Sequence, residues 1–455
     1  MSNTTVYLDD DSSIQWDKRY KRNVWVYVLI YGLLGGVAGI TLYTLVSYLD
    51  IIAPQVVTGL NMYSAIGQAI VAILLLYVHK VGYKKILLIT PIITVISMIV
   101  TVLSDNTAIV ALAYILITAG VSLYDFMYPL MYTVYVPREK RTFMMSVVMC
   151  VNLIMQAIVS FFGGKIVVWV FSLKQGISYQ EASILSADSS KMNSLQLHNY
   201  IIGYKTVIII AIILTALAFF SAFLLREKRD DYIETKKEKE QNKAKNALDF
   251  KVLAKKDVIL WLVFLGLTQI GILLVVPYFP IYLNEFLHIQ RGTVSTIISF
   301  QTLAMVLGYM CAPWLEKTMG SVVSNAVTTI LCIPMMLLIA KGNIFGGAVT
   351  IVIGIILFIR SGLANAAMPI QQSLQMILVS KDMRPAFSSL MTIINAIIGI
   401  LVGLFTQNVL LKTSAGYATA YYITSFFYFA ASILLLIFFT KKYNRVMSPK
   451  KQKQK

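Results

Sequence analysis

The sequence predicts an all-α polytopic membrane protein with 12 transmembrane helices, arranged as two six-helix bundles. The chain is 58% hydrophobic and 13% charged, which is too apolar for an ordinary soluble protein. Twelve long apolar stretches follow one another, and one charged segment, 226–257, divides them into two sets of six. Because lipid offers no hydrogen-bond partner to the backbone, such stretches must be helices. Most reach the roughly 20 residues that a helix needs to cross a bilayer.

Each set of spans defines one predicted domain. The amino-terminal bundle, 24–225, contains predicted spans at 24–48, 57–78, 84–104, 107–135, 142–172 and 200–225. The carboxy-terminal bundle, 258–440, contains predicted spans at 258–283, 293–313, 321–340, 344–378, 385–411 and 414–440. Segment 226–257 is too polar to fold alone, so we expect a mobile or partly helical linker.

The basic residues are distributed unevenly between the two sides of the predicted membrane. The net charge is +18, and 31 of the 39 Lys and Arg residues fall in the segments on the side of the termini, against 6 in the opposite loops. This bias predicts a cytoplasmic segment 1–23, a cytoplasmic linker and a basic cytoplasmic tail 441–455 in a protein of the cell membrane. The same bias accounts for the net charge of +18, so we expect no nucleic-acid partner. No small-residue cleavage site follows the first span, so we expect no cleaved signal peptide.

The two halves repeat short polar patterns in the same order. A polar residue four positions before a proline occurs in the fourth span of each half. The first span of each half ends in Tyr-Leu followed by an acidic or an amide residue. The matched positions are Asp125 and Pro129 with Asn365 and Pro369, and Tyr48 to Asp50 with Tyr282 to Asn284. Such repeats are typical of one large transporter fold. Pro277 and Pro280 should kink the seventh span.

Two loops at equivalent places in the halves share a further motif. Lys80, Gly82, Lys84 and Lys85 follow span 2, and Glu316, Lys317 and Gly320 follow span 8. These loops resemble the loop motif of major facilitator superfamily transporters, with His79 at the usual acidic position. The resemblance implies that fold over essentially the whole chain and a gating role for these loops. A simple positive-inside anchor is the alternative for the two lysines.

Charges inside spans are costly and usually face a cavity or a partner. Asp125 is therefore a candidate proton-coupling carboxylate, and Arg360 is its candidate partner or an anchor for an anionic group on the cargo. The alternative for both is a structural tether between helices. Lys165 lies nearer a span end, from which its side chain could reach the interface.

Uncharged polar side chains could line a binding cavity with these charges. The candidates are Asn152, Gln156, Gln269, Gln301, Asn365 and Tyr128. Amides donate and accept hydrogen bonds, which suits a cargo that carries hydroxyl or amide groups. The alternative is that they join helices to one another at about 0.6 kcal/mol each.

No enzymatic motif is present in the sequence. The residues that could bind a metal or form a disulfide are scattered: His79, His198, His288, Cys150, Cys311 and Cys332. No phosphate-binding loop of the Gly-x-x-x-x-Gly-Lys-Ser/Thr type occurs. We therefore expect neither enzymatic activity nor a metal or other cofactor.

The leading hypothesis is a secondary active transporter that moves a small organic solute by alternating access. We expect proton coupling and slightly favour efflux, although the fifth span keeps only Gly163-Gly164 of the Gly-Pro-x-x-Gly-Gly pattern of drug exporters. One alternative is a lipid or glycolipid flippase on the same scaffold. Another is a non-transporting membrane sensor or assembly protein that uses the polar segment 172–200. The expected partners are a small-molecule or lipid-like substrate, protons and the bilayer, and the chain could act as a monomer.

Overall fold

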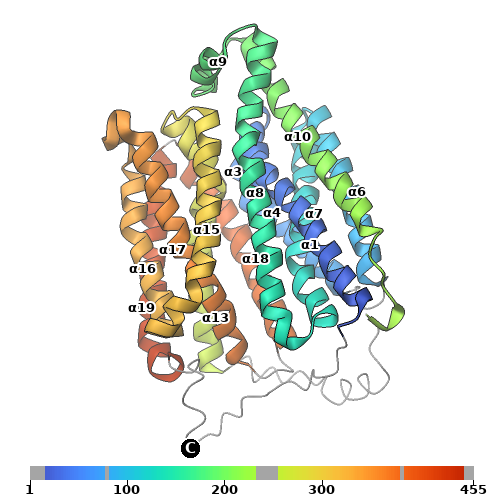
Figure 1. Ribbon diagram of the computed structural model, residues 1–455. Helices are drawn as coiled ribbons and strands as arrows, with labels where there is room; N and C mark the ends of the chain where they lie inside the picture. The colour runs from blue at the N-terminus through green and yellow to red at the C-terminus, as the bar shows by residue number, and fades with distance from the viewer. Residues whose placement is uncertain (1–15, 77–80, 232–254, 380–383, 414, 445–455) are drawn as a thin grey trace, which may run out of the picture.

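The computed structural model describes residues 16–76, 81–231, 255–379, 384–413 and 415–444, whose regular elements are all helical (Figure 1). Eleven of the described helices are long and apolar enough to cross a membrane. The second predicted span, 57–78, is not among these eleven and corresponds to α4 (Leu60–Leu76), a shorter apolar helix. The predicted fold class is therefore confirmed, and the charged segment 232–254 lies outside the described residues.

The first span begins as α1 and passes through a π-helical segment, η1, into α2. The amino-terminal elements are α1 (Lys18–Gly39), η1 (Ile40–Thr44), α2 (Leu45–Ile52), α3 (Pro54–Thr58), α4, α6 (Tyr83–Leu103), α7 (Thr107–Tyr135), α8 (Arg138–Gln175), α9 (Tyr179–Leu185), η2 (Ser189–Lys191), α10 (Ser194–Ala222) and η3 (Arg229–Asp231). Helix α10 starts earlier than predicted because Asn193 and Gln196 form a capping box, which a hydropathy pattern does not reveal.

The seventh span is broken where the two prolines predicted a kink. Its α-helix ends at Val275, and Pro277 and Pro280 lie in the 3₁₀ and short α segments that follow. The carboxy-terminal elements are α13 (Lys256–Val275), η4 (Val276–Tyr278), α14 (Phe279–Ile281), η5 (Tyr282–Phe286), α15 (Arg291–Met319), α16 (Ser321–Ala340), η6 (Gly342–Ala348), α17 (Val349–Ile377), α18 (Arg384–Asn408), η8 (Leu410–Lys412) and α19 (Ala415–Tyr443).

Glycines let α1 and α8 approach closely inside the amino-terminal bundle. A Cβ atom added to Gly35 would lie 2.2 Å from the backbone oxygen of Asn152, and one added to Gly39 would lie 2.7 Å from that of Gln156. No larger residue fits these positions without moving a helix. The face of α1 that carries these glycines is therefore a helix-packing face.

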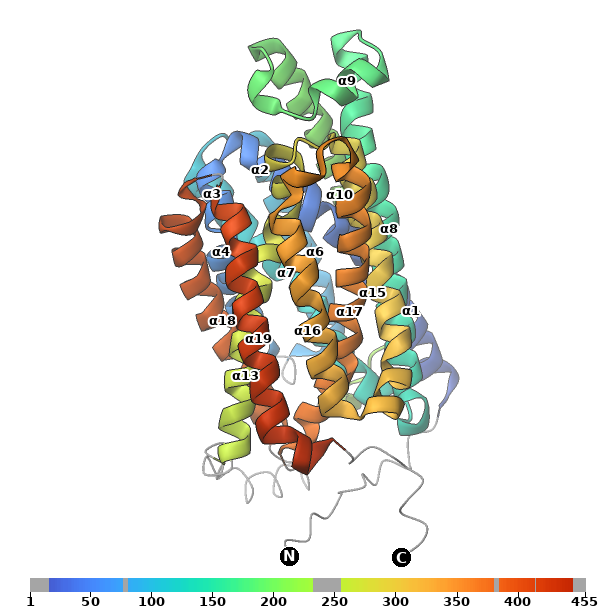
Figure 2. The same ribbon diagram turned by 90° about the vertical axis from the view of Figure 1, so that its left-hand side faces the viewer.

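Two helix pairs form the interface between the bundles, α8 with α15 and α4 with α18. We call the end of the molecule that carries the described termini the proximal end, and the opposite end, where α9 lies, the distal end (Figures 1 and 2). The hydrogen bonds that join the bundles within the described residues lie from mid-membrane to the distal end. They link Thr58 to Tyr278 and Thr406, Asn61 to Leu273 and Tyr278, Tyr43 to Arg291, Ala157 to Ser299, Ser183 to Gln290, Ser186 to Asn284 and Arg291, and Ser189 to Glu285. The distal end is therefore closed.

Candidate functional site

Asp125 lies on α7, in the half of the helix nearer its carboxy terminus. The hydroxyl of Tyr31 on α1 donates to its Oδ1 at 2.5 Å, and the residue as a whole is exposed. Tyr309 on α15 of the other bundle is close enough to interact electrostatically with both Asp125 and Tyr128. The Asp125 carboxylate is thus bound within its own bundle and lies near a side chain of the other bundle.

Tyrosine rings surround this carboxylate on the amino-terminal side. The Tyr31 ring lies 6.0 Å from the Tyr27 ring and 5.7 Å from the Tyr128 ring, measured between centroids. Asn152 on α8 donates through Nδ2 to the Tyr31 backbone oxygen at 2.8 Å. Asn152 therefore fixes the part of α1 that presents the Tyr31 hydroxyl to Asp125.

Arg360 occupies a different environment, inside the carboxy-terminal bundle. Its Nη2 donates to the Tyr428 hydroxyl at 3.3 Å, and its guanidinium carbon lies 5.5 Å from the centroid of the Phe279 ring. The residue is 4% exposed, and its Nε has no hydrogen-bond partner among the described atoms. Asp125 and Arg360 are not brought into contact with each other. Arg360 is held by aromatic groups rather than by a carboxylate, so it is a buried cation that could receive an anion.

The other candidates divide between the bundle interface and local contacts. Gln156 lies at the interface, where its side chain and that of Thr302 from α15 approach the Tyr43 hydroxyl. Gln301 is buried, and its Oε1 has no partner within the described residues. Asn365 donates to the Ser361 oxygen one turn away at 2.9 Å.

Two remaining candidates make no polar contact in the described part of the chain. Gln269 is half-buried on α13. Lys165 places its Nζ 3.4 Å from the centroid of the Phe161 ring, which is a cation–π contact on its own helix.

The predicted gating loop after the second span begins outside the described residues, which leaves His79 and Lys80 undescribed. Gly82 has φ of 94° and stands directly before α6, so the turn requires glycine there. The Nζ of Lys84 donates to the backbone oxygens of Phe223 and Leu225 at 3.0 and 2.7 Å. Lys84 thereby satisfies carbonyls at the end of α10, where a cation is favourable. Lys85 is exposed.

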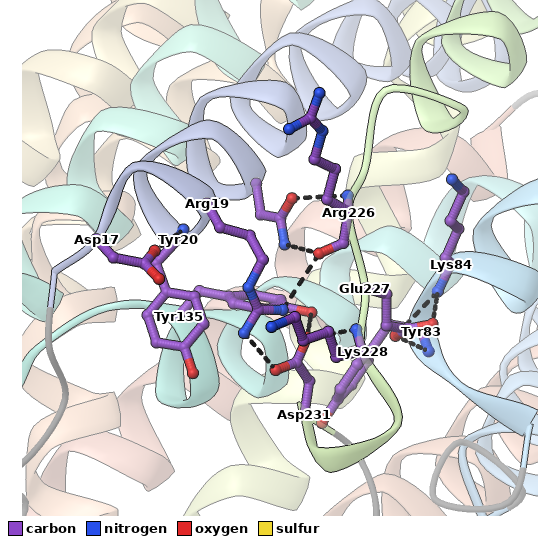
Figure 3. A network of polar contacts seen from close by, with 11 residues as sticks. Asp17, Arg19, Tyr20, Tyr83, Lys84, Tyr135, Arg226, Glu227, Lys228 and Asp231 are labelled. Carbon is purple, nitrogen blue, oxygen red and sulfur yellow. Dashed lines mark hydrogen bonds and ion pairs between the residues drawn. The ribbon is translucent and has the colours of Figure 1, made fainter.

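Glu227, which follows the sixth span, is distant from this loop in sequence but binds it in space (Figure 3). Its carboxylate accepts from the backbone N–H of Tyr83 at 2.7 Å and from that of Lys84 at 3.2 Å, so it caps the first turn of α6. Burial raises the pKa of the Glu227 carboxyl above its ordinary value, and these N–H groups partly oppose the rise. The sequence prediction missed Glu227; an acid directly after the sixth span, opposite a Gly-x-Lys turn, was the available signal.

Asp231 extends the network to two more helices (Figure 3). It bonds the guanidinium of Arg19 on α1 at 2.6 Å and accepts from the Tyr135 hydroxyl on α7 at 3.1 Å. Asn23 exchanges two hydrogen bonds with the backbone of Arg226. Residues 226–231, where the sequence predicted the start of a mobile or partly helical linker, are thus bound to the amino-terminal bundle.

The carboxy-terminal bundle repeats this arrangement with different chemistry. Gly320 has φ of 83° and precedes α16. The Oδ1 of Asn444, just after the last span, accepts from the backbone N–H groups of Val322 at 3.0 Å and Val323 at 2.9 Å. Glu316 accepts from the Ser321 hydroxyl at 2.9 Å, and Lys317 is exposed. In both bundles, a side chain that follows the sixth span caps the amino terminus of the helix that forms the third span.

Comparison with known proteins places this architecture among transporters. A family model described as Major Facilitator Superfamily matches residues 24–404. No curated protein matches significantly. Among solved structures, the nucleoside transporter NupG is 16% identical with a TM-score of 0.63, covering 91% of this chain and 99% of NupG. A D-xylose-proton symporter is 12% identical with a TM-score of 0.67, covering 91% and 97%. The E. coli fucose:proton symporter FucP is 14% identical with a TM-score of 0.58, covering 92% and 99%. At these identities the solved structures share the fold alone.

Proposed function

Because the chain belongs to the Major Facilitator Superfamily, and is thus a membrane transporter rather than an enzyme, we propose that it moves a small organic solute by proton-coupled alternating access. The distribution of cross-bundle contacts supports this mechanism. The bundles are joined from mid-membrane to the distal end, whereas no described hydrogen bond joins them at the proximal end. Two bodies joined at one end can rock to expose a central site to either side.

The proximal end is assigned to the cytoplasm on the charge bias. Lys and Arg residues number 31 in the segments on the side of the termini and 6 in the opposite loops. Both termini are then cytoplasmic, the distal end faces outwards, and the described conformation is inward-facing. The cell membrane is the expected location.

The observation that carries proton coupling is the position of Asp125. Asp125 is an exposed residue within a membrane span, its carboxylate accepts a hydrogen bond from Tyr31, and it lies close enough to Tyr309 of the other bundle to interact electrostatically. Neutralising it changes the charge between the bundles, which couples a proton to their relative movement. Arg360 is assigned as an anchor for an anionic or strongly polar group of the solute. The proposed direction of transport is outward, because the aromatic-rich composition of the chain favours efflux.

Flux measurements in proteoliposomes test this function. The panel would contain radiolabelled sugars and nucleosides, the cargo classes of the similar structures, and any metabolite that accumulates when the protein is removed from cells. Asp125→Asn should abolish solute movement driven by a pH gradient while counterflow of solute persists. The matched control, Asp105→Asn, alters an exposed loop carboxylate and should leave transport unchanged.

Two results would contradict the proposal. Full pH-driven flux in Asp125→Asn would remove its proposed coupling residue. Movement of headgroup-labelled lipid in place of every tested solute would favour the flippase alternative instead.

A further inference from the structure

Asp125 is a carboxylate within a membrane span that has a hydrogen-bond donor beside it but no cation. The Tyr31 hydroxyl donates to its Oδ1 at 2.5 Å, and no described Lys, Arg or His forms an ion pair with it. Asp125 is exposed, although its neighbours Leu123 and Met127 along α7 are completely buried. A charge inside a span usually lines a cavity or pairs with an opposite charge. A ligand can therefore supply the positive charge that the described residues do not.

The contacts around Asp125 lead to α8, a helix at the boundary between the bundles. Tyr128 lies three residues after Asp125, on the neighbouring part of the same helix face. Its hydroxyl donates to the Sδ of Met149 on α8 at 3.6 Å. Asn152, also on α8, donates to the Tyr31 backbone oxygen at 2.8 Å. Because α8 packs against α15 of the other bundle, Asp125 and its tyrosines lie beside the helix that forms this boundary.

Tyrosine rings pack next to the carboxylate. The centroid of the Tyr31 ring lies 5.7 Å from that of Tyr128 and 6.0 Å from that of Tyr27, and the Tyr27 and Tyr31 rings are stacked at 16°. Tyr27 is buried behind Tyr31, whereas Tyr128 is only half-buried and offers part of its ring to a ligand. An aromatic face attracts a cation through its quadrupole, and quaternary ammonium groups are recognised in this way. A carboxylate beside such rings is suited to an organic cation.

A metal cation fits these residues less well. Metal ions in proteins take several carboxylate, imidazole, thiolate or carbonyl ligands. Within the described part of the chain, no group of three or more His, Cys, Asp and Glu could hold a metal ion. The side chains beside Asp125 are instead phenol rings. An ammonium ion binds through one positive charge and an apolar surface, which is what one carboxylate and these rings offer.

We propose that Asp125, Tyr31 and Tyr128 bind an organic ammonium group of the solute, with the carboxylate paired to the positive nitrogen and the rings against its alkyl substituents. The inference rests on the proposed function and names the substrate class at the same site. The Asp125 carboxylate binds either the proton or the ammonium group, so the two occupy it in turn. Arg360 does not contact Asp125 and is left to a polar or anionic group of the solute.

Equilibrium binding to the purified full chain in lipid nanodiscs tests this site without transport. The probes are radiolabelled tetramethylammonium, tetraethylammonium and benzyltrimethylammonium, which carry the same charge at increasing size. At least one of them should bind saturably to the wild type. Asp125→Asn removes the negative charge and should weaken this binding by about tenfold or more. Asp125→Glu keeps the charge and should restore most of the binding.

Tyr128→Leu tests the contribution of the ring. Leucine keeps an apolar side chain but has no aromatic face, so binding should weaken by about two- to thirtyfold. The matched controls are Asp105→Asn, in an exposed loop, and Tyr422→Leu, at an exposed position on α19, and both should bind like the wild type. An unfolding midpoint close to that of the wild type verifies that each variant is folded.

The proposal would be overturned if none of the three cations bound saturably to the wild type, or if Asp125→Asn or Tyr128→Leu bound them unchanged. The flux assay of Asp125→Asn gives a separate answer. Loss of pH-driven flux of a neutral sugar or nucleoside beside unchanged cation binding would refute the cation site and leave the proposed function standing. Loss of cation binding beside normal pH-driven flux would do the reverse.

Discussion

Replacing Glu227 by alanine should loosen the whole amino-terminal bundle at its proximal end. The carboxylate caps α6 through two backbone N–H groups at 2.7 and 3.2 Å, and no other group replaces it among the described contacts. Loss of a side-chain cap costs about 1 kcal/mol, within a range of roughly 0.5–2. Because burial disfavours the ionised form of Glu227, we count the cap alone and expect Glu227→Ala to destabilise the protein by about 0.5–2 kcal/mol.

The assay is thermal unfolding of the purified protein in detergent. For domains of about 200 residues, 1 kcal/mol corresponds to roughly 2–4 °C, so the midpoint should fall by several degrees. Glu227→Gln keeps an acceptor oxygen and removes a buried charge, so it should unfold close to the wild type. Lys228→Ala, at an exposed neighbour, should stay within about 0.5 kcal/mol of the wild type. The reasoning fails if Glu227→Ala unfolds like Lys228→Ala, or if Glu227→Gln is as unstable as Glu227→Ala.

Three further predictions follow from particular contacts. Burial raises the pKa of the Glu227 carboxyl, so its stabilising contribution is complete below the ordinary glutamate pKa of about 4.3 and is lost as the pH rises through the folded-state pKa. The wild-type unfolding midpoint should therefore fall relative to that of Glu227→Gln as the pH rises above about 4. Gly35→Ala should cost about 1–3 kcal/mol in the same assay because its Cβ would lie 2.2 Å from the Asn152 oxygen, whereas Gly347→Ala, which has open space, should be neutral. Gly164→Ala would put a Cβ 2.0 Å from the Ser295 hydroxyl oxygen on α15. The distance between a spin label on each bundle at the distal end should therefore increase.

The spans could be predicted from sequence because every backbone N–H and C=O group inside lipid needs a hydrogen-bond partner in the protein, which makes long apolar stretches helical. Helix ends outside the lipid follow other rules, which hydropathy does not report. Helix α8 continues to Gln175, and α9 begins at the capping box of Ser178 and Glu181. The polar segment 172–200, which was a candidate contact surface, partly binds the carboxy-terminal bundle through Ser183, Ser186 and Ser189.

The candidate site was predicted as residue types but not as an arrangement. A charged or polar side chain inside a span is costly and therefore usually has a structural or functional role, and this rule selected Asp125 as a candidate. The rotation of that helix depends on packing against helices distant in sequence, which one sequence does not reveal. The hydrogen bond of Asp125 with Tyr31 and its electrostatic interaction with Tyr309 involve three helices and both bundles. Arg360 was predicted by the same rule, yet its surroundings are aromatic.

The caps of α6 and α16 explain why the deepest similarity between the bundles escapes sequence comparison. A glycine with positive φ starts each helix, and the orphan N–H groups that follow need an acceptor. Glu227 supplies a carboxylate in one bundle and Asn444 an amide in the other, at unequal distances along the chain. The physical requirement is repeated while the residue is not. In each bundle the cap ties the end of the sixth span to the start of the third, so each bundle is closed on itself at the proximal end. Two such closed units can move relative to each other without loosening internally, which is the mechanical condition for alternating access.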